Sequence, residues 1–107
     1  MELKLKNKTA FISGSTDGIG FAIACSLLEE GVKVIINGRS EKSVTQALKR
    51  LKEKFPESNV WGIPADFSIT TDVKNLIKNL PEIDILINNV GIFEPKIFTE
   101  ISDSDWF

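Results

Sequence analysis

The chain of 107 residues contains no histidine and no tyrosine, and Cys25 is its single cysteine. Within these residues, the lack of histidine excludes a Ser-His-Asp triad and histidine metal ligands, and the lack of tyrosine excludes a tyrosine general acid. A single cysteine forms no internal disulfide. Because Cys25 lies in an apolar, helix-like segment, we interpret it as a small buried hydrophobe rather than a nucleophile.

Long apolar runs and an excess of basic charge are also missing. No apolar run approaches the ~20 residues of a membrane helix, and the first residues lack the apolar segment of a signal peptide. A net charge of −2 and a pI of about 5.1 disfavour binding to the phosphates of nucleic acids. We therefore expect a cytoplasmic protein with neither a membrane nor a nucleic-acid partner.

The composition, 42% hydrophobic and 26% charged, is typical of one small globular domain. Apolar, β-branched runs alternate with segments of helical period, and this alternation is typical of βαβ units around a parallel sheet. The predicted strands span residues 9–13, 33–37, 60–64 and 83–88, and the predicted helices span residues 18–30, 40–55 and 70–80. We predict an α/β fold with a Rossmann-like, doubly wound parallel sheet.

Capping residues and apolar stripes refine the helix predictions. Ser40 is expected to cap the second helix, and Thr70 or Thr71 the third. The first helix has two neighbouring apolar stripes, which together make a broad face apolar. One stripe contains Ile19, Ile23 and Leu27, and the other contains Phe21, Cys25 and Leu28.

Three glycines lie between the first predicted strand and the first helix. Gly14, Gly18 and Gly20 have the spacing Gly-x3-Gly-x-Gly. Glycine permits a sharp turn and a close approach of a diphosphate to the main chain, and the helix start supplies N–H donors. We interpret the segment as a dinucleotide-binding turn in which Gly14 reverses the chain, Gly18 admits the pyrophosphate and Gly20 lets the helix pack closely.

Further candidate residues follow the other strands. Gly38-Arg39 follows the second strand, Ala65-Asp66 the third, and Asn88-Asn89-Val90-Gly91 the fourth. Each is also compatible with an ordinary turn. Because ligands of open α/β sheets bind beyond the carboxyl ends of the strands, their shared position favours one binding site.

These motifs resemble those of the short-chain dehydrogenase/reductase family, which has a Thr-Gly-x3-Gly-x-Gly turn, an Asp after the third strand and an Asn-Asn-Ala-Gly stretch. The resemblance covers residues 8–107, with Ser13 in place of the threonine and Val90 in place of the alanine. It implies a strand order of 3-2-1-4. It also implies a nicotinamide dinucleotide partner.

The resemblance assigns cofactor contacts to named positions. Ser15, Thr16 and Ile19 would line the phosphates. Asp66 and the amide of Phe67 would meet the adenine, although Asp66 is alternatively a residue that only caps its loop. Asn89 and Gly91 would flank the adenine ribose.

The preferred cofactor is predicted from the end of the second strand, which reads Asn37-Gly38-Arg39. NAD sites place an acid about 20 residues after the glycine motif, whereas an arginine there serves the 2′-phosphate of NADP. No acid is present, so we predict NADP over NAD. Asp17 would repel that phosphate if it lies nearby, but we favour a role for Asp17 in capping the free N–H groups of the helix.

The resemblance implies reversible hydride transfer between nicotinamide and a carbonyl or alcohol. The serine, the Tyr-x-x-x-Lys pair and the asparagine of that reaction would lie beyond residue 107, so we assign no catalytic residue here. Ser102 and Asp105 have the spacing of a capping box and predict the start of a helix. The chain stops within the first turn of this helix, after Trp106-Phe107. We interpret residues 1–107 as the N-terminal part of an NAD(P)-binding Rossmann-fold domain that ends inside a helix. The alternative is a stand-alone, non-catalytic nucleotide-binding or regulatory module.

A truncated sheet would leave the fourth strand without a fifth neighbour. Exposed strand edges promote association. We therefore expect the isolated chain to be inactive, marginally stable and prone to self-association, whereas the resemblance implies that full-length relatives form homo-oligomers.

Overall fold

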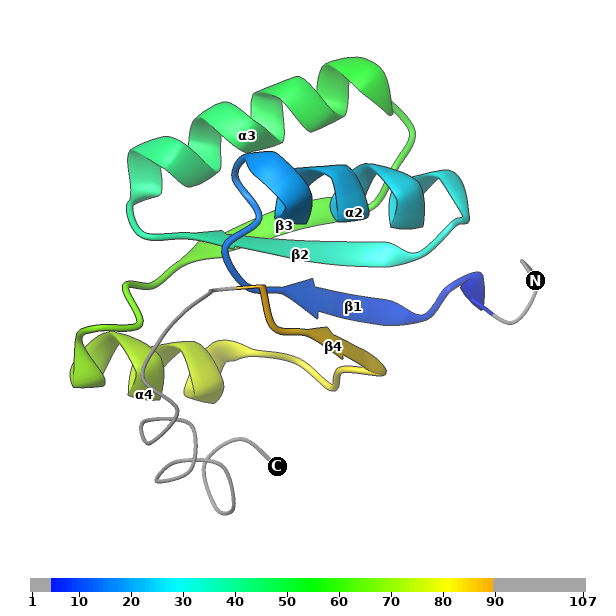
Figure 1. The fold of residues 1–107 in the computed structure, drawn as a ribbon. Coiled ribbons are helices and arrows are strands. Elements are labelled where there is room, and N and C mark those ends of the chain that lie inside the picture. The colour runs from blue at the N-terminus through cyan, green and yellow to red at the C-terminus, as the bar shows by residue number, and fades with distance from the viewer. Residues whose placement is uncertain (1–4, 90–107) are drawn as a thin grey trace.

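Strands and helices alternate along the chain in the computed structural model, which describes residues 5–89 (Figure 1). The elements are β1 (Thr9–Ile12), α2 (Gly18–Glu29), β2 (Lys33–Gly38), α3 (Glu41–Lys54), β3 (Val60–Pro64), α4 (Thr70–Asn79) and β4 (Ile85–Ile87). The predicted alternation is confirmed, and the largest difference is at β4, which is shorter than predicted. No helix within residues 5–89 has the length and apolar character to cross a membrane.

The strands form a parallel sheet in the order β3-β2-β1-β4, which confirms the predicted order. Phe11 on β1 lies opposite Ile35 on β2 and Leu86 on β4. The chain runs outward from β1 through β2 to β3 and then crosses back to β4 on the other side of β1. The strand order therefore reverses at β1, and the carboxyl end of β1 is the place where open sheets bind ligands.

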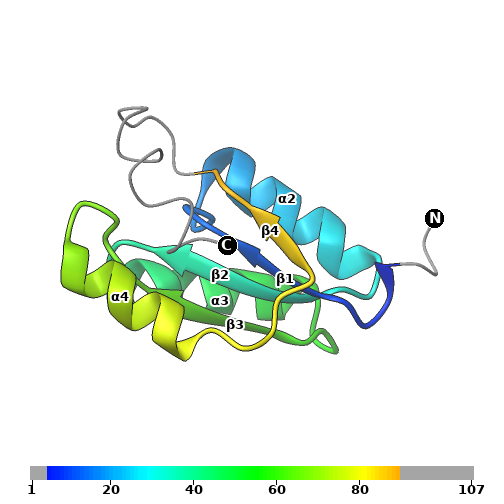
Figure 2. The same ribbon diagram turned by 90° about the horizontal axis from the view of Figure 1, so that it is seen from below.

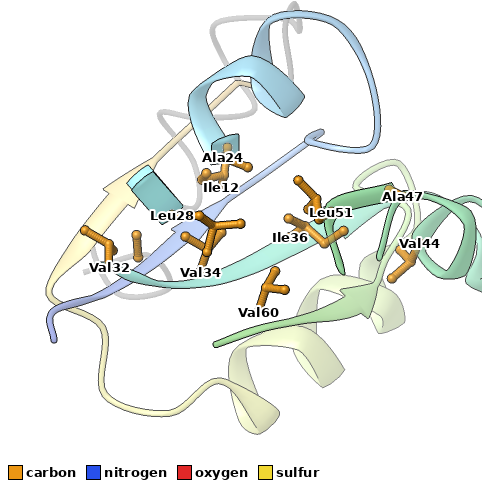
Figure 3. Close-up of a cluster of buried hydrophobic side chains, with 11 residues drawn as sticks. Ile12, Ala24, Leu28, Val32, Val34, Ile36, Val44, Ala47, Leu51 and Val60 are labelled. Atoms are coloured by element: carbon orange, nitrogen blue, oxygen red, sulfur yellow. The ribbon is translucent and has the colours of Figure 1, made fainter. Parts of the chain in front are cut away.

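Helices cover both faces of the sheet. Helices α2 and α3 lie on one face and α4 lies on the other, as Figure 1 shows and the view from below confirms (Figure 2). On the first face, Ile12, Val34 and Ile36 pack against Ala24 of α2 and Leu51 of α3 (Figure 3). This cluster is the larger of the two apolar cores.

The second core lies under α4 and combines Phe11, Ile35, Ala65 and Leu76. Successive side chains of a strand point to opposite faces, so Val34 and Ile36 enter one core while Ile35 enters the other. This explains the continuous apolar runs of β1 and β2, because both faces of these strands are buried.

The buried side of α2 includes Leu28 from the predicted apolar stripes, and its other residues are smaller than predicted. Gly20, Ala24 and Leu28 are the buried residues of this helix, while Ile19 is 72% exposed. Two small residues bring the helix close to the β1–α2 turn and the sheet, and this rotates the larger apolar side chains toward the flanks. Cys25 packs against the first core in a half-buried position.

The helix starts confirm one predicted cap and correct another. Ser40 caps α3, where its side-chain oxygen accepts from the amide of Ser43 at 3.1 Å. Ile69 occupies the cap position of α4, and no described side chain makes the capping hydrogen bond. The prediction of Thr70 or Thr71 as the cap is therefore wrong, because Thr70 is already the first helical residue.

We predict that Ser40→Ala lowers the free energy of unfolding by about 0.5–2 kcal/mol, because an amide at the start of α3 loses its partner. Thr70→Ala is the matched control and should change it by less than about 0.5 kcal/mol. Urea denaturation of both variants measures the difference. Equal destabilisation by the two substitutions would contradict the assignment of the caps.

Candidate functional site

The turn between β1 and α2 requires glycine at two positions. Gly14 has φ of 58° and Gly18 has φ of 62°, values in the left-handed region that other residues rarely adopt. A side chain at Gly18 would meet no atom within 4 Å, so the start of α2 is open there. A Cβ at Gly20 would lie 2.5 Å from the carbonyl oxygen of Gly14, which explains why the helix approaches the turn so closely.

Two asparagine side chains hold Gly14 from opposite sides. The amide of Gly14 donates to Oδ1 of Asn37 at 2.9 Å, and its carbonyl accepts from Nδ2 of Asn89 at 3.0 Å. Asn37 belongs to β2 and Asn89 follows β4, so the turn is tied to the strands on both sides of β1. We call this arrangement, Asn37–Gly14–Asn89, the glycine clamp.

Asn37 also reaches the end of β3. Its Nδ2 donates to the carbonyl of Ile63 at 3.1 Å and to that of Ala65 at 3.4 Å, and the residue is 1% exposed. The sequence predicted no role for Asn37 itself, which was noted only because an NAD site has an acid near this position. Its polarity within an otherwise apolar strand was the available signal, because a buried polar side chain is nearly always hydrogen-bonded.

Ser15 lies behind the turn rather than on its surface. Its hydroxyl donates to the carbonyl of Ile12 at 2.8 Å and accepts from the amide of Asn37 at 2.9 Å, and Ser15 is fully buried. Its own amide donates to the carbonyl of Asn37 at 2.8 Å. Ser15 therefore fixes the turn from within, and its predicted place beside the phosphates stays a prediction.

The segment after β4 is anchored to the end of β1. The hydroxyl of Ser13 donates to Oδ1 of Asn88 at 3.1 Å and accepts from the amide of Asn89 at 2.8 Å. The side-chain amide of Asn89 is thus committed to Gly14, and its predicted place beside the ribose stays a prediction. Gly91 and the helix predicted from Ser102 and Asp105 lie outside the described residues.

A cleft of about 390 Å³ opens beyond the carboxyl ends of β1, β2 and β3. Its lining residues are Gly14, Thr16, Asp17, Asn37, Gly38, Arg39, Ala65, Asp66, Phe67 and Ser68. The structure therefore brings together the predicted residues Thr16, Arg39, Asp66 and Phe67. The predicted residues Gly18 and Ile19 lie at the adjacent start of α2, and Ile19 exposes most of its side chain.

A second hollow of about 530 Å³ lies at the opposite edge of the sheet, where α2 and α3 end. Leu28, Lys54 and Phe55 are among its lining residues. Helix C-termini present carbonyl groups and the negative end of the dipole, whereas the first cleft lies beside the start of α2. An anionic ligand therefore favours the cleft at the carboxyl edge, although the other hollow is larger.

Asp66 closes the loop after β3. Hydrogen bonds from the hydroxyl of Ser68 at 2.7 Å and from its amide at 2.9 Å, both to Oδ1, hold the pKa of Asp66 below its usual 3.8, and the charge of Arg39 acts in the same direction. The amide of Asp66 donates in turn to Oδ2 of Asp72 at 2.9 Å. Asp66 therefore caps its loop through one carboxylate oxygen, Oδ1, as the loop-capping interpretation predicts.

Asp17 occupies the cap position of α2, but within the described part of the chain its side chain makes no capping hydrogen bond. It lies instead among the cleft residues with Arg39 and Asp66. The interpretation of Asp17 as a cap is correct for its position at the start of α2 and wrong for the hydrogen bond. No cluster of three potential metal ligands occurs among residues 5–89.

Comparisons with known proteins agree with this architecture. The family profile described as short chain dehydrogenase matches residues 8–107. An uncharacterized oxidoreductase of Bacillus subtilis, YvaG, is 49% identical over 109 positions that cover 100% of this chain and 40% of that protein. The 3alpha-hydroxysteroid dehydrogenase of Mediterraneibacter gnavus is 36% identical, covering 96% of this chain and 46% of that protein. The chain thus spans less than half the length of these curated relatives.

Solved structures show the same arrangement of elements. L-sorbose reductase from Gluconobacter frateurii, complexed with NADPH and L-sorbose, superposes with a TM-score of 0.75 at 31% identity, covering 88% of this chain and 37% of that chain. The NADPH-bound short chain oxidoreductase from Pseudomonas aeruginosa PAO1 superposes with a TM-score of 0.71 at 26% identity, covering 81% of this chain and 37% of that chain. Both similarities extend over most of the described residues.

We predict that Ser68→Ala raises the pKa of Asp66 toward 3.8, because the largest cause of the lowered value is removed. Because the folded-state pKa is lower than the unfolded one, the loop gains stability when the pH is above the unfolded pKa. It loses that stability as the pH falls through the folded-state pKa. Carbon-13 NMR titration of the carboxyl group measures the change. Ser58→Ala, whose hydroxyl bonds to Phe55 at the opposite edge, is the control. An unchanged titration of Asp66 in Ser68→Ala would contradict this explanation.

Proposed function

The chain belongs to the short-chain dehydrogenase family, and on that basis we propose that residues 1–107 are the N-terminal, dinucleotide-binding part of an NADP-dependent oxidoreductase. The proposed reaction is reversible hydride transfer between nicotinamide and a carbonyl or alcohol. The observation that carries the proposal is the cleft at the carboxyl edge, where the glycine turn, Arg39 and Asp66 meet beside the start of α2.

The start of α2 fits a diphosphate. Free N–H groups and the positive end of the helix dipole face the open space at Gly18, and the first turn of the helix contains no acidic residue. We propose that the main chain from Gly18 to Gly20 binds the pyrophosphate, with the side chains of Thr16 and Ile19 beside it. The hydrogen bonds of the glycine clamp fix Gly14 and thereby the position of the turn.

The loop after β3 fits the adenine. Asp66 and Phe67 line the cleft, and one carboxylate oxygen of Asp66 is engaged by Ser68. The other oxygen is an acceptor suited to an exocyclic amine. In this arrangement Asn89 and Gly91 would flank the adenine ribose, as the family resemblance implies.

The end of β2 favours NADP. Asn37 points into the protein, and a Cβ at Gly38 would collide with the side chain of Thr16. Arg39 lines the cleft, and we propose that it is the residue of this strand end that binds the 2′-phosphate. A charge-assisted hydrogen bond from Arg39 contributes about 1.5–3 kcal/mol. Repulsion from the exposed Asp17 is screened by water and salt and amounts to about 1 kcal/mol or less. Arg39 therefore outweighs Asp17, and the NADPH in two solved relatives supports the same preference.

The bound nicotinamide supplies the hydride chemistry, whereas these residues bind and orient the dinucleotide. Because the 107 residues include no tyrosine, a tyrosine acid of the kind the resemblance implies would come from another part of the full-length protein. We propose this division of roles for the N-terminal part of the domain. The homo-oligomeric state of full-length relatives and self-association of the isolated chain stay predictions.

We predict that Arg39→Ala removes the preference for NADP over NAD, a loss of roughly tenfold to hundredfold in relative affinity. Affinity for NAD should change little, because NAD lacks the 2′-phosphate. Calorimetric titration of the full-length protein with both cofactors measures the ratio. Lys49→Ala, which removes an exposed positive charge on α3, is the control. Tighter binding of NAD than of NADP by the unmodified protein would refute the assignment.

We predict that Asp17→Asn tightens NADP binding by about two- to fivefold while NAD binding changes less, because one negative charge leaves the cleft. The gain should shrink as salt is added, since screening already weakens the repulsion. Glu53→Gln on the exposed side of α3 makes the same charge change at a distance and is the control. Equal gains in the two variants would show that the effect is one of net charge alone.

A further inference from the structure

Building on the proposed function, we propose that Asn37 is a positioning residue: its buried side-chain amide presets the dinucleotide-binding turn before the cofactor arrives. The cleft has three walls, formed by the turn after β1, the residues after β2 and the loop after β3. The side chain of Asn37 is hydrogen-bonded to Gly14 in the turn after β1 and to the carbonyls of Ile63 and Ala65 at the end of β3. Along the chain, Asn37 leads directly into the residues that form the second wall.

The chemistry of the site requires an amide. On one side Asn37 faces an N–H group and must accept a hydrogen bond, and on the other it faces carbonyl groups and must donate. A neutral carboxamide does both, an ionised carboxylate accepts only, and an apolar side chain does neither. Burying a polar side chain brings little net stability compared with an apolar one. The amide therefore acts mainly on the position of the turn.

Substitution with aspartate separates position from volume, because Asn and Asp have nearly the same shape. In Asn37→Asp the acceptor toward Gly14 remains, but the ionised group meets the carbonyls of Ile63 and Ala65 without a donor. Burial and these carbonyls raise the pKa of the new carboxyl group. When protonated, the group regains one donor. The variant should therefore bind the cofactor poorly at high pH and recover at low pH.

The experiment measures the dissociation constant for NAD, from pH 5.5 to 8.5, in the full-length protein and its variants. NAD is the probe because the 2′-phosphate of NADP titrates near pH 6 and would obscure the profile. We expect Asn37→Asp to weaken binding about tenfold or more at pH 8.5 relative to the unmodified protein, and to approach its affinity at pH 5.5. Asn59→Asp, an exposed change at the opposite edge, is the matched control and should give a ratio near one throughout.

The outcomes separate this inference from the proposed function. If the unmodified protein binds neither dinucleotide, the proposed function fails. If it binds, but Asn37→Asp is folded and its affinity ratio is independent of pH or equal to that of the control, the role of Asn37 is refuted.

A measurement on the unmodified protein covers the case in which Asn37→Asp does not fold. The Gly14 amide, which donates to Asn37, should exchange its hydrogen slowly without cofactor, and binding should slow it by less than about tenfold. Fast exchange in the free protein, with strong protection only after binding, would show that the cofactor forms the turn and would overturn the proposal.

Discussion

The glycine clamp is the constraint on which the rest of the site depends. Strand β1 ends at Ile12 and α2 begins at Gly18, and backbone hydrogen bonds tie the turn between them to β4 at Ser13 and to β2 at Ser15. Asn37 and Asn89 supply fixed partners for both polar groups of Gly14, and they come from the two neighbours of β1. The parallel order of the sheet thus places the turn, and the turn directs the start of α2 toward the cleft.

The charges of the cleft explain how a protein of net charge −2 can bind an anion. The dipole of α2 and the main-chain N–H groups act on the diphosphate at short range, where the net charge of the molecule matters little. Arg39 adds a cation beside the proposed 2′-phosphate. Asp66 directs one oxygen to its own loop. Asp17 weakens the positive field of the cleft, and the proposed preference for NADP requires that Arg39 outweigh it.

The sequence predicted the fold well, because β-branched runs and helical periods report burial directly. It also predicted Thr16, Arg39, Asp66 and Phe67 at one cleft, because the carboxyl ends of parallel strands meet at one edge. The sequence did not reveal side-chain direction at three positions. Ser15 and Asn37 face inward and Ile19 faces solvent, since the close approach of Gly20 and the clamp decide these orientations. Such contacts join residues far apart in the chain, as Gly14 and Asn89 show, and a local pattern does not identify the partners.

The central claim is that the carboxyl edge of this sheet binds a nicotinamide dinucleotide. Backbone amide NMR of the full-length protein during titration with NADP tests it most directly. We expect the largest chemical-shift changes from Gly18 to Gly20, at Arg39 and from Asp66 to Ser68. Changes confined to the hollow around Asn7 and Asn59, or no saturable change at all, would contradict it.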